Sequence, residues 1–309
     1  MILRLDSSPI SNAARPALMR GQVVATHGRH YLVQLADGRV LTCFPRGKRS
    51  WLACGDLVAV AQTASTQGVI DAVDPRRTLL YRCDRYRQKL IAANVGQMVI
   101  VLATVPSFYE ELLNRCLVAA EHQGIGALIV LNKFDLIEQT SPALQALELY
   151  RGLGYTVLPL TAKQDVSPLR AHLERRLSVL VGQSGMGKST IVNGLLPEVR
   201  APTGDISLAL DSGRHTTTHA RLYRLDEHSS LIDSPGLQEF GLLHLTQADL
   251  ARAFVEFRPY LGRCKFNDCR HCNEPGCAVT AAWERGDLSE RRLSVYRRLT
   301  AELDRASKR

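Results

Sequence analysis

The pattern of hydrophobic and polar positions divides the chain into three parts. In residues 20–75, short β-branched runs such as "GQVVATH" and "HYLVQL" are separated by turn signals such as "ADGR". Five such runs predict a small closed barrel of the OB type, a fold that commonly binds oligonucleotides. An SH3-like barrel or a protein-docking module would show the same number of runs. The basic and aromatic loop "FPRGKRSW" at 44–51 has a composition suited to nucleic-acid contact.

The central part of the chain alternates apolar runs with helical stretches. Residues 76–92 are polar and basic with little periodicity, and we expect a linker there. From 93 to 244 the alternation is typical of an α/β sheet. The expected strands are "QMVIVLA", "ALIVLN", "YTVLPLT", "LSVLVG", "ARLYRL" and "SSLIDS", and the expected helices lie around 107–122, 141–152, 167–175 and 189–196.

The last part, residues 245–309, is expected to be mainly helical, around 246–257, 277–285 and 289–305. Residues 1–19 lack the apolar region of a signal peptide, so we expect a flexible tail. No apolar run approaches the roughly 18 residues of a membrane span. We therefore expect a cytoplasmic protein with no membrane partner.

Charge adds a bias toward polyanionic partners. The chain carries 39 Lys and Arg against 30 Asp and Glu, a net charge of +9. Such a balance suits nucleic acid, although a generally basic surface explains it equally well. A solvated amphipathic helix also explains the basic residues near the C-terminus as readily as a nucleic-acid surface does.

The stretch "GQSGMGKST" at 182–190 matches the phosphate-binding loop G-x-x-x-x-G-K-[ST], and it lies between a strand and a helix as that motif requires. Its glycines let backbone amides approach phosphates at the positive helix N-terminus. Lys188 is expected to reach the β- and γ-phosphates, and Ser189 to bind Mg²⁺. The expected nucleotide contacts are Gly182, Gln183, Ser184, Gly185, Met186, Gly187, Lys188, Ser189 and Thr190.

Two further motifs indicate that the base is guanine. In "NKFD" at 132–135, Asp135 can accept both N1–H and N2–H₂ of guanine, a pair that adenine does not offer. Asn132 is expected to tie this loop to neighbouring backbone, and Lys133 to pack on the base and ribose. The turn "TAK", formed by Thr161, Ala162 and Lys163, offers the Ala162 amide to guanine O6. GTP is therefore favoured over ATP, and Asp135 argues against an ATP-using kinase.

The stretch "DSPG" at 233–236 follows another expected strand. Asp233 is expected to hold Mg²⁺, and the Gly236 amide to sense the γ-phosphate. The preceding polar connection contains "GRHTTTH" at 213–219, and such a loop can be ordered by γ-phosphate and Mg²⁺. One of the three threonines is expected to contact the metal; they are Thr216, Thr217 and Thr218.

The residue that activates water is not the usual one. In Ras-like GTPases a glutamine orients the attacking water, and the position after the D-x-x-G glycine is here Leu237. His215 is the best catalytic candidate, because an imidazole can orient and polarise water near neutral pH. A histidine that only braces the loop is the alternative.

The motifs occur in an unusual order. Small GTPases begin with the phosphate loop, whereas this chain runs NKFD, TAK, GQSGMGKST, GRHTTT, DSPG. Because each motif still follows a strand, joining the old termini and cutting before the guanine motifs would keep the same site in space. We therefore predict a circular permutation, in which the second switch at 237–243 runs directly into the C-terminal part.

The C-terminal part contains "CKFNDCRHCNEPGC". Cys264, Cys269, His271 and Cys277 have the spacing C-x4-C-x-H-x5-C, and three thiolates with one imidazole form a closed tetrahedral set typical of structural zinc. Cys272 is an alternative to His271 as the fourth ligand.

Together these residues resemble the RsgA (YjeQ) family of circularly permuted GTPases, which carry a hydrophobic residue in place of the catalytic glutamine. The resemblance covers roughly residues 20–300, and Thr161 departs from the usual serine. It implies an OB-fold barrel at 20–75, a permuted GTPase domain at 93–244 and a helical zinc domain at 245–309. It also implies binding to the small ribosomal subunit and its rRNA, GTP hydrolysis stimulated by that subunit, and action late in its maturation.

The resemblance carries the catalytic role onto His215 and the zinc-ligand role onto Cys264, Cys269, His271 and Cys277. We therefore predict a monomeric GTPase that uses Mg²⁺ with GTP and holds one structural zinc ion per chain. The rival hypothesis is a non-catalytic RNA-binding switch in which GTP only gates affinity.

Overall fold

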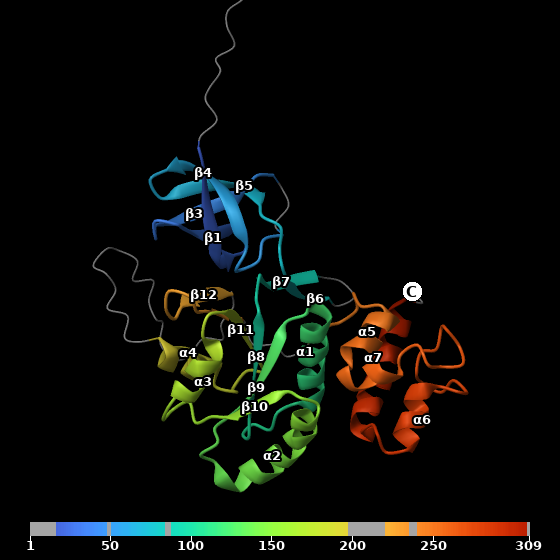
Figure 1. Ribbon diagram of the computed structural model, residues 1–309. Helices are drawn as coiled ribbons and strands as arrows, with labels where there is room; N and C mark the ends of the chain where they lie inside the picture. Colours follow the sequence, from blue (N-terminus) through green and yellow to red (C-terminus); the bar gives the residue numbers. More distant parts are fainter. Residues whose placement is uncertain (1–16, 48–50, 84–87, 197–219, 235–239, 308–309) are drawn as a thin grey trace, which may run out of the picture.

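A computed structural model describes residues 17–47, 51–83, 88–196, 220–234 and 240–307 (Figure 1). Its N-terminal strands are β1 (Leu18–His27), β2 (His30–Leu35), β3 (Val40–Pro45), β4 (Leu57–Ala64) and β5 (Gln67–Val73). They pair in the order β1-β2-β3-β5-β4, and β4 pairs back on β1, so the sheet closes. This confirms the predicted OB-type barrel. Alternate residues such as Val23, Val33 and Leu41 fill its interior, as the period of two predicts.

The α/β part has a sheet in the order β10-β9-β8-β11-β13-β12. Its strands are β8 (Gln97–Ala103), β9 (Gly126–Asn132), β10 (Thr156–Pro159), β11 (Leu177–Val181), β12 (Arg221–Arg224) and β13 (Ser230–Asp233). They run parallel except for β12, which is antiparallel to β13. The helices are α1 (Glu110–Gln123), α2 (Ile137–Gly152), α3 (Ser167–Leu173) and α4 (Lys188–Leu195). Every residue of the central strand β8 is buried, as expected when helices cover both faces of a parallel sheet.

The helices divide between the two faces of this sheet. Leu113 and Leu117 of α1 and Tyr150 of α2 share one apolar core with Ile100 of β8. On the other face, residues of α3 and α4 share a second core with alternate residues of the same strands. The α/β sheet predicted from the alternation of strands and helices is therefore present, with helices on both faces.

The segment expected to be a linker contains a β-hairpin formed by β6 (Leu79–Cys83) and β7 (Gln88–Ala93). Leu80 and Ile91 are buried in the main core, and Cys54 of the barrel forms a parallel bridge with Ala92. The strands form because these apolar residues pack against residues that are distant in sequence. The hydrophobic pattern of the segment itself does not reveal such contacts. The barrel also joins the central sheet through β1 and β12, where Ala25 pairs with Arg221.

The C-terminal part is helical, as predicted. Its elements are α5 (Gln247–Ala253), the short 3₁₀ helix η1 (Val255–Tyr260), α6 (Ala278–Glu284) and α7 (Glu290–Ser307). The side chain of Thr246 accepts a hydrogen bond from the Asp249 amide at the start of α5, and Asp249 bonds back to the Thr246 amide. Phe254, Phe257 and Tyr296 belong to the same core as α1, and Figure 1 shows α5 and α7 beside α1. Within the described ranges, no helix combines the length and apolar character needed to cross a bilayer.

Candidate functional site

The predicted nucleotide motifs lie at the carboxyl ends of neighbouring strands. Asn132 and Asp233 are the last residues of β9 and β13, and Gly182 directly follows β11. These strands lie close together in the order β9-β8-β11-β13. In open α/β sheets, ligands bind outside the carboxyl ends of the strands, so one edge of the sheet gathers the phosphate and guanine motifs.

The phosphate loop needs glycine because its backbone packs closely against other loops. Gly187 has φ +94°, and a Cβ placed there would lie 2.2 Å from Nδ2 of Asn132. A Cβ at Gly182 would lie 2.4 Å from the carbonyl oxygen of Val101 on β8. Helix α4 begins directly after this loop, at Lys188, so the loop stands at a helix N-terminus, where the first amides have no intrahelical acceptor.

Lys188 is held inside the phosphate loop. Its ammonium group donates to the carbonyl oxygens of Gly182 and Gln183, each at 2.8 Å. The side chain is buried, and burial lowers the lysine pKa, while the negative charge of Asp233 opposes that shift. A buried ammonium group at the centre of the loop suits the binding of an anionic phosphate.

Asn132 connects three of the predicted motifs. Its Oδ1 accepts a hydrogen bond from the Ala162 amide at 3.0 Å, and its Nδ2 donates to the Met186 carbonyl at 2.9 Å. The side chain is only 3% exposed, so water does not compete for these bonds. One side chain thus joins NKFD to TAK and to GQSGMGKST, as expected if the three motifs form one site. In this structure the Ala162 amide donates to Asn132. The predicted bond from this amide to guanine O6 would require it to leave Asn132, and it stays a prediction.

The remaining guanine-motif residues lie at the surface of the same edge. Lys133 has φ +59°, and its ammonium group donates to the carbonyl oxygen of Val105. Asp135 and Lys163 are exposed, where a base could reach them, and Thr161 is half-buried. Such a surface leaves the Asp135 carboxylate open to an incoming ligand.

Of the two residues expected to bind magnesium, Ser189 belongs to the phosphate-loop motif, and Asp233 lies on the strand next to the one that precedes it. Asp233 is buried at the end of β13, which pairs with β11, the strand that precedes the loop. Ser189 is exposed in the first turn of α4. The neighbouring Ser234 donates its hydroxyl proton to the Leu180 carbonyl at 2.7 Å and so ties the start of DSPG to β11.

A second cluster lies in the C-terminal part. One ligand atom from each of Cys264, Cys269, His271 and Cys277 lies within 4.8 Å of all the others. The Nδ1 atom of His271 is 3.4, 3.6 and 3.5 Å from the sulfurs of Cys264, Cys269 and Cys277. Tetrahedral zinc, with bonds of about 2.3 Å to sulfur and 2.0 Å to nitrogen, sets this separation at about 3.5 Å. The cluster therefore has the dimensions of a Cys₃His metal site.

Backbone donors orient two of these sulfurs. The Ala278 amide donates to the Cys264 sulfur at 3.3 Å, and the Thr280 amide donates to the Cys277 sulfur at 3.4 Å. Both donors belong to the first turn of α6, where backbone N–H groups have no intrahelical partner. These bonds would stabilise thiolates, the form of cysteine that binds a metal.

Comparison with known proteins decides the family. A model of the RsgA GTPase family matches residues 73–243, which contain every predicted nucleotide motif. The chain belongs to the RsgA GTPase family. It is 59% identical over 286 residues to the small ribosomal subunit biogenesis GTPase RsgA of Nitrosospira multiformis, covering 93% of this chain and 91% of that protein. It is 52% identical to the protein of the same name from Nitrosomonas europaea, covering 93% of each chain.

Solved structures agree with this RsgA assignment. YjeQ from Thermotoga maritima aligns with a TM-score of 0.71 and 28% identity, covering 93% of this chain and 99% of that one. YloQ, described as a circularly permuted GTPase, aligns with a TM-score of 0.68 and 26% identity, covering 96% and 98%. The recognised family and the fold class, a permuted GTPase between a barrel and a helical metal-binding part, are therefore confirmed.

Several predicted site residues of this RsgA-family chain lie outside the described residues. They are His215, Thr216, Thr217, Thr218 and Gly236, together with Leu237. Their roles stay predictions. The roles given to the described nucleotide and metal residues also stay predictions, although the structure brings these residues together as the motifs require.

Sequence reasoning missed the loop after β8, residues 104–109. The Tyr109 amide donates to the Oε1 atom of Gln183 at 3.0 Å, which ties this loop to the phosphate loop. The Val105 carbonyl accepts from Lys133, and the Thr104 hydroxyl donates to the Lys133 carbonyl at 3.2 Å, which ties it to the guanine motif. In the sequence, this loop could have been found only from its position directly after the central strand, because ligands bind at the carboxyl ends of the strands in such sheets.

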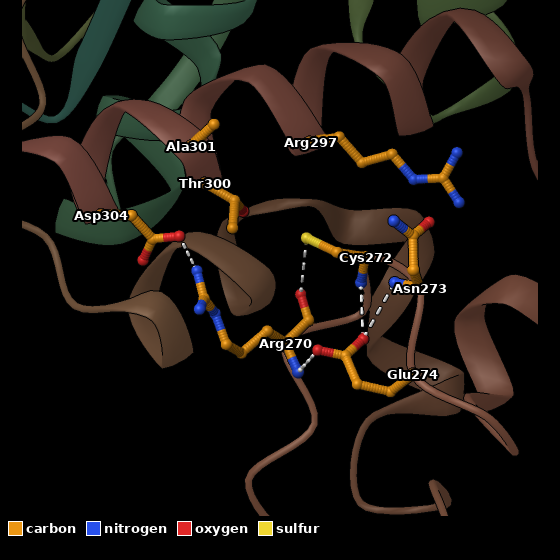
Figure 2. Close-up of a pocket in the computed structure, with 8 residues that line it drawn as sticks. All are labelled: Arg270, Cys272, Asn273, Glu274, Arg297, Thr300, Ala301 and Asp304. Atoms are coloured by element: carbon orange, nitrogen blue, oxygen red, sulfur yellow. Dashed lines mark hydrogen bonds and ion pairs between the residues drawn. The ribbon is translucent and has the colours of Figure 1, made fainter.

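The alternative metal ligand Cys272 points away from the cluster. Its sulfur donates to the Arg270 carbonyl at 3.6 Å, and Figure 2 shows the thiol turned toward α7. The side chain lies in a cavity of about 440 Å³ lined by Arg270, Cys272, Asn273, Glu274, Arg297, Thr300, Ala301 and Asp304. Arg270 forms an ion pair with Asp304, and Glu274 accepts from backbone amides, so the charges here are largely satisfied internally. The geometry thus favours His271 over Cys272 as the fourth ligand.

Proposed function

We propose that this protein binds the small ribosomal subunit, hydrolyses GTP when that subunit stimulates it, and acts late in small-subunit maturation. The observation that supports the nucleotide part is the pair of hydrogen bonds that Asn132 makes, one accepted from the Ala162 amide and one donated to the Met186 carbonyl, which connects the loops that carry the guanine and phosphate motifs. Relatives at 59% and 52% identity over nearly the whole chain are named small ribosomal subunit biogenesis GTPases, which supports the ribosomal part.

In this proposal, the predicted nucleotide-binding residues have distinct roles. Asp135 selects guanine, Lys188 binds the β- and γ-phosphates, and Ser189 and Asp233 hold Mg²⁺. His215 orients the attacking water, and one of the threonines at 216–218 contacts the metal. The loop at 104–109 positions the guanine and phosphate loops relative to each other, because it bonds to both.

The proposed zinc ion is structural. Three sulfurs and one imidazole fill the four positions of a tetrahedral site, so no position stays open for a substrate. His271 is buried, and its ring lies 6.4 Å from that of Tyr296, a residue of the main core on α7. Zinc would therefore fix the loop at 264–277 against α7.

The partner surfaces follow from charge and fold. We propose that the barrel at 20–75 and the C-terminal part at 245–309 contact rRNA, with 76–92 connecting the barrel to the GTPase domain at 93–244. The tail expected at 1–19 overlaps the barrel, because β1 begins at Leu18 and pairs there with β4. The net charge of +9 suits this partner. The protein would act as a monomer, because the ribosomal subunit supplies the partner surface, and in the cytoplasm, where that subunit matures.

The variant His215→Ala tests whether the protein is an enzyme or a nucleotide-gated RNA binder. We expect it to lose the stimulated GTP hydrolysis while its affinity for GTP changes by less than about twofold, because the imidazole acts on water and not on the base. His228→Ala is the matched control, since His228 is exposed in the turn between β12 and β13. Stimulated turnover that survives in His215→Ala would contradict the catalytic role.

A further inference from the structure

The segment "EPGC" at 274–277 forms a type II turn beside the metal cluster. The Cys277 amide donates to the Glu274 carbonyl at 3.2 Å, which closes the turn. Pro275 and Gly276 occupy its two central positions, and Gly276 has φ +74°, as the third residue of such a turn requires. A Cβ at Gly276 would also lie 2.9 Å from the Cβ of Lys265. The turn therefore fixes the backbone of Glu274 three residues before a metal ligand.

The Glu274 side chain folds back onto the preceding loop (Figure 2). Its Oε1 accepts a hydrogen bond from the Arg270 amide at 3.2 Å. Its Oε2 accepts from the amides of Cys272 and Asn273 at 2.9 and 3.1 Å. Converging backbone amides form a concavity for an anion, and their bonds to a carboxylate are stronger than bonds between neutral groups. One carboxylate thus holds the backbone on both sides of His271.

His271 has a backbone conformation that it would not favour alone. Its φ is +60°, in the left-handed region that costs free energy for a residue with a Cβ. Such a conformation persists only where the surrounding structure holds it. Here the flanking amides bond to Glu274, and the Tyr296 hydroxyl donates to the Arg270 carbonyl at 2.8 Å. These bonds hold the loop against α7 with His271 in the left-handed region.

Consecutive side chains leave this loop on opposite sides. His271 is buried, and its Nδ1 lies between 3.4 and 3.6 Å from the three sulfurs of the cluster. The Cys272 thiol instead donates to the Arg270 carbonyl at 3.6 Å and turns toward α7 (Figure 2). The choice between the two ligands is therefore set by the backbone at 270–273.

The position of the carboxylate separates two ways in which it could act on the cluster. Oε2 of Glu274 lies 3.8 Å from the Cys269 sulfur. A negative charge this close does not favour a thiolate, the form of cysteine that binds a metal. Glu274 therefore contributes through the amides that it holds and not through its charge on the sulfurs.

We propose, on the basis of the metal site described above, that Glu274 is the positioning residue that selects His271 instead of Cys272 as the fourth ligand. It does so by fixing the backbone at 270–273 in the conformation that aims the imidazole at the three sulfurs. A glutamate that only stabilised the loop would affect the affinity for the metal but not the identity of the ligands. The two roles therefore predict different results.

Metal binding by the full-length protein tests this selection. Each protein is freed of metal and titrated with Co²⁺, whose visible absorption distinguishes three sulfurs and one nitrogen from four sulfurs, and zinc affinity is then measured by competition. We expect Glu274→Ala to weaken zinc binding by about 10- to 100-fold, the usual effect of removing a group that orients a ligand. Its Co²⁺ spectrum should shift toward four sulfurs. Asp268→Ala is the matched control, because Asp268 is exposed in the same loop, and it should keep the wild-type affinity and spectrum.

The sharpest comparison starts from His271→Ala. While Glu274 is present, Cys272 stays turned toward α7, so this variant should bind Co²⁺ weakly. Adding Glu274→Ala releases the loop, and we expect the affinity to recover by about tenfold or more with a four-sulfur spectrum. Adding Cys272→Ser to this double variant should remove the recovery. A gain in affinity from a second substitution is a result that a merely stabilising glutamate would not give.

Three results would overturn these roles. If Glu274→Ala keeps the three-sulfur spectrum and the double variant shows no recovery, Glu274 does not select the ligand. A four-sulfur spectrum in the wild type would show that Cys272 is already a ligand. A wild-type protein that binds no metal would overturn the proposed metal site itself. Thermal melts and binding of a fluorescent GDP analogue check that each variant is folded. If Glu274→Ala does not fold, Glu274→Gln replaces it, since it keeps the side-chain length with only one acceptor oxygen.

Discussion

Replacing Asn132 with alanine removes the side chain that connects the guanine and phosphate loops. The Ala162 amide and the Met186 carbonyl each lose a partner, at 3.0 and 2.9 Å from a side chain that is 3% exposed. A buried backbone group left without a partner costs about 1–3 kcal/mol, so the two together cost about 2–6 kcal/mol. In the variant, nucleotide binding itself must order the guanine and phosphate loops, and this uses part of the binding free energy. We therefore expect the binding free energy to weaken by at least about 2 kcal/mol, which corresponds to roughly a 30-fold increase in Kd.

The assay is an equilibrium titration with a fluorescent GDP analogue, accompanied by a thermal melt. Asn193→Ala is the matched control, because Asn193 is exposed on α4, the helix that follows the phosphate loop. Asn132→Asp should weaken binding as well, since it places a carboxylate oxygen where an N–H donor met the Met186 carbonyl. A Kd for Asn132→Ala within about twofold of the wild-type value, with an unchanged melting temperature, would refute the reasoning.

Three further predictions concern the C-terminal part and its contact with the GTPase domain. Cys277→Ser should reduce the bound zinc, measured by metal analysis, from one ion per chain to well below one, and a stoichiometry that stays at one would contradict the ligand set. Glu256→Gln should lower stability by about 3–5 kcal/mol, seen as an earlier thermal transition, because it leaves the guanidinium of Arg292 buried without its carboxylate; the two side chains are 7% and 2% exposed. Burial opposes the charge of Arg292, and in the wild type hydrogen bonding to Glu256 raises the pKa of Arg292. A guanidinium group stays protonated at neutral pH even without this partner, so deprotonation cannot relieve the loss. An unchanged transition would count against this. Burial, with a smaller effect of His122, lowers the pKa of His244 to about 4, so the stability that its neutral form contributes should be full above about pH 6.5 and be lost as the pH falls toward 4. His244→Phe should weaken this dependence in melts across that range, and identical pH profiles for the two proteins would argue against it.

Much of the fold could be predicted because the spacing of apolar residues along the sequence matches the repeat of the helix or strand that they form. The run "QMVIVLA" has no polar alternation after its first residue, and it forms β8, which is buried on both faces. Likewise, Asn132 and Asp233 end strands, as their positions after apolar runs indicated. These features depend on residues close in sequence, so local patterns are sufficient to find them.

Features that depend on distant residues could not be predicted. The basic residues of the β6–β7 hairpin are typical of a linker sequence. Its strands form because they are stabilised by contacts in the core and by the bridge from Cys54 to Ala92, which involve residues distant in sequence. The choice between His271 and Cys272 depends on which side chain points at the three other sulfurs, and spacing alone does not fix that direction. The bonds from the loop at 104–109 to two motifs likewise arise only when the strands are assembled.

The most direct test of the proposed function measures GTP hydrolysis by the purified protein alone, with small ribosomal subunits and with large ribosomal subunits. Strong stimulation by small subunits and none by large subunits is the predicted result. Equal, slow rates in all three reactions would contradict a ribosome-stimulated enzyme and leave a nucleotide-gated RNA-binding protein as the better explanation.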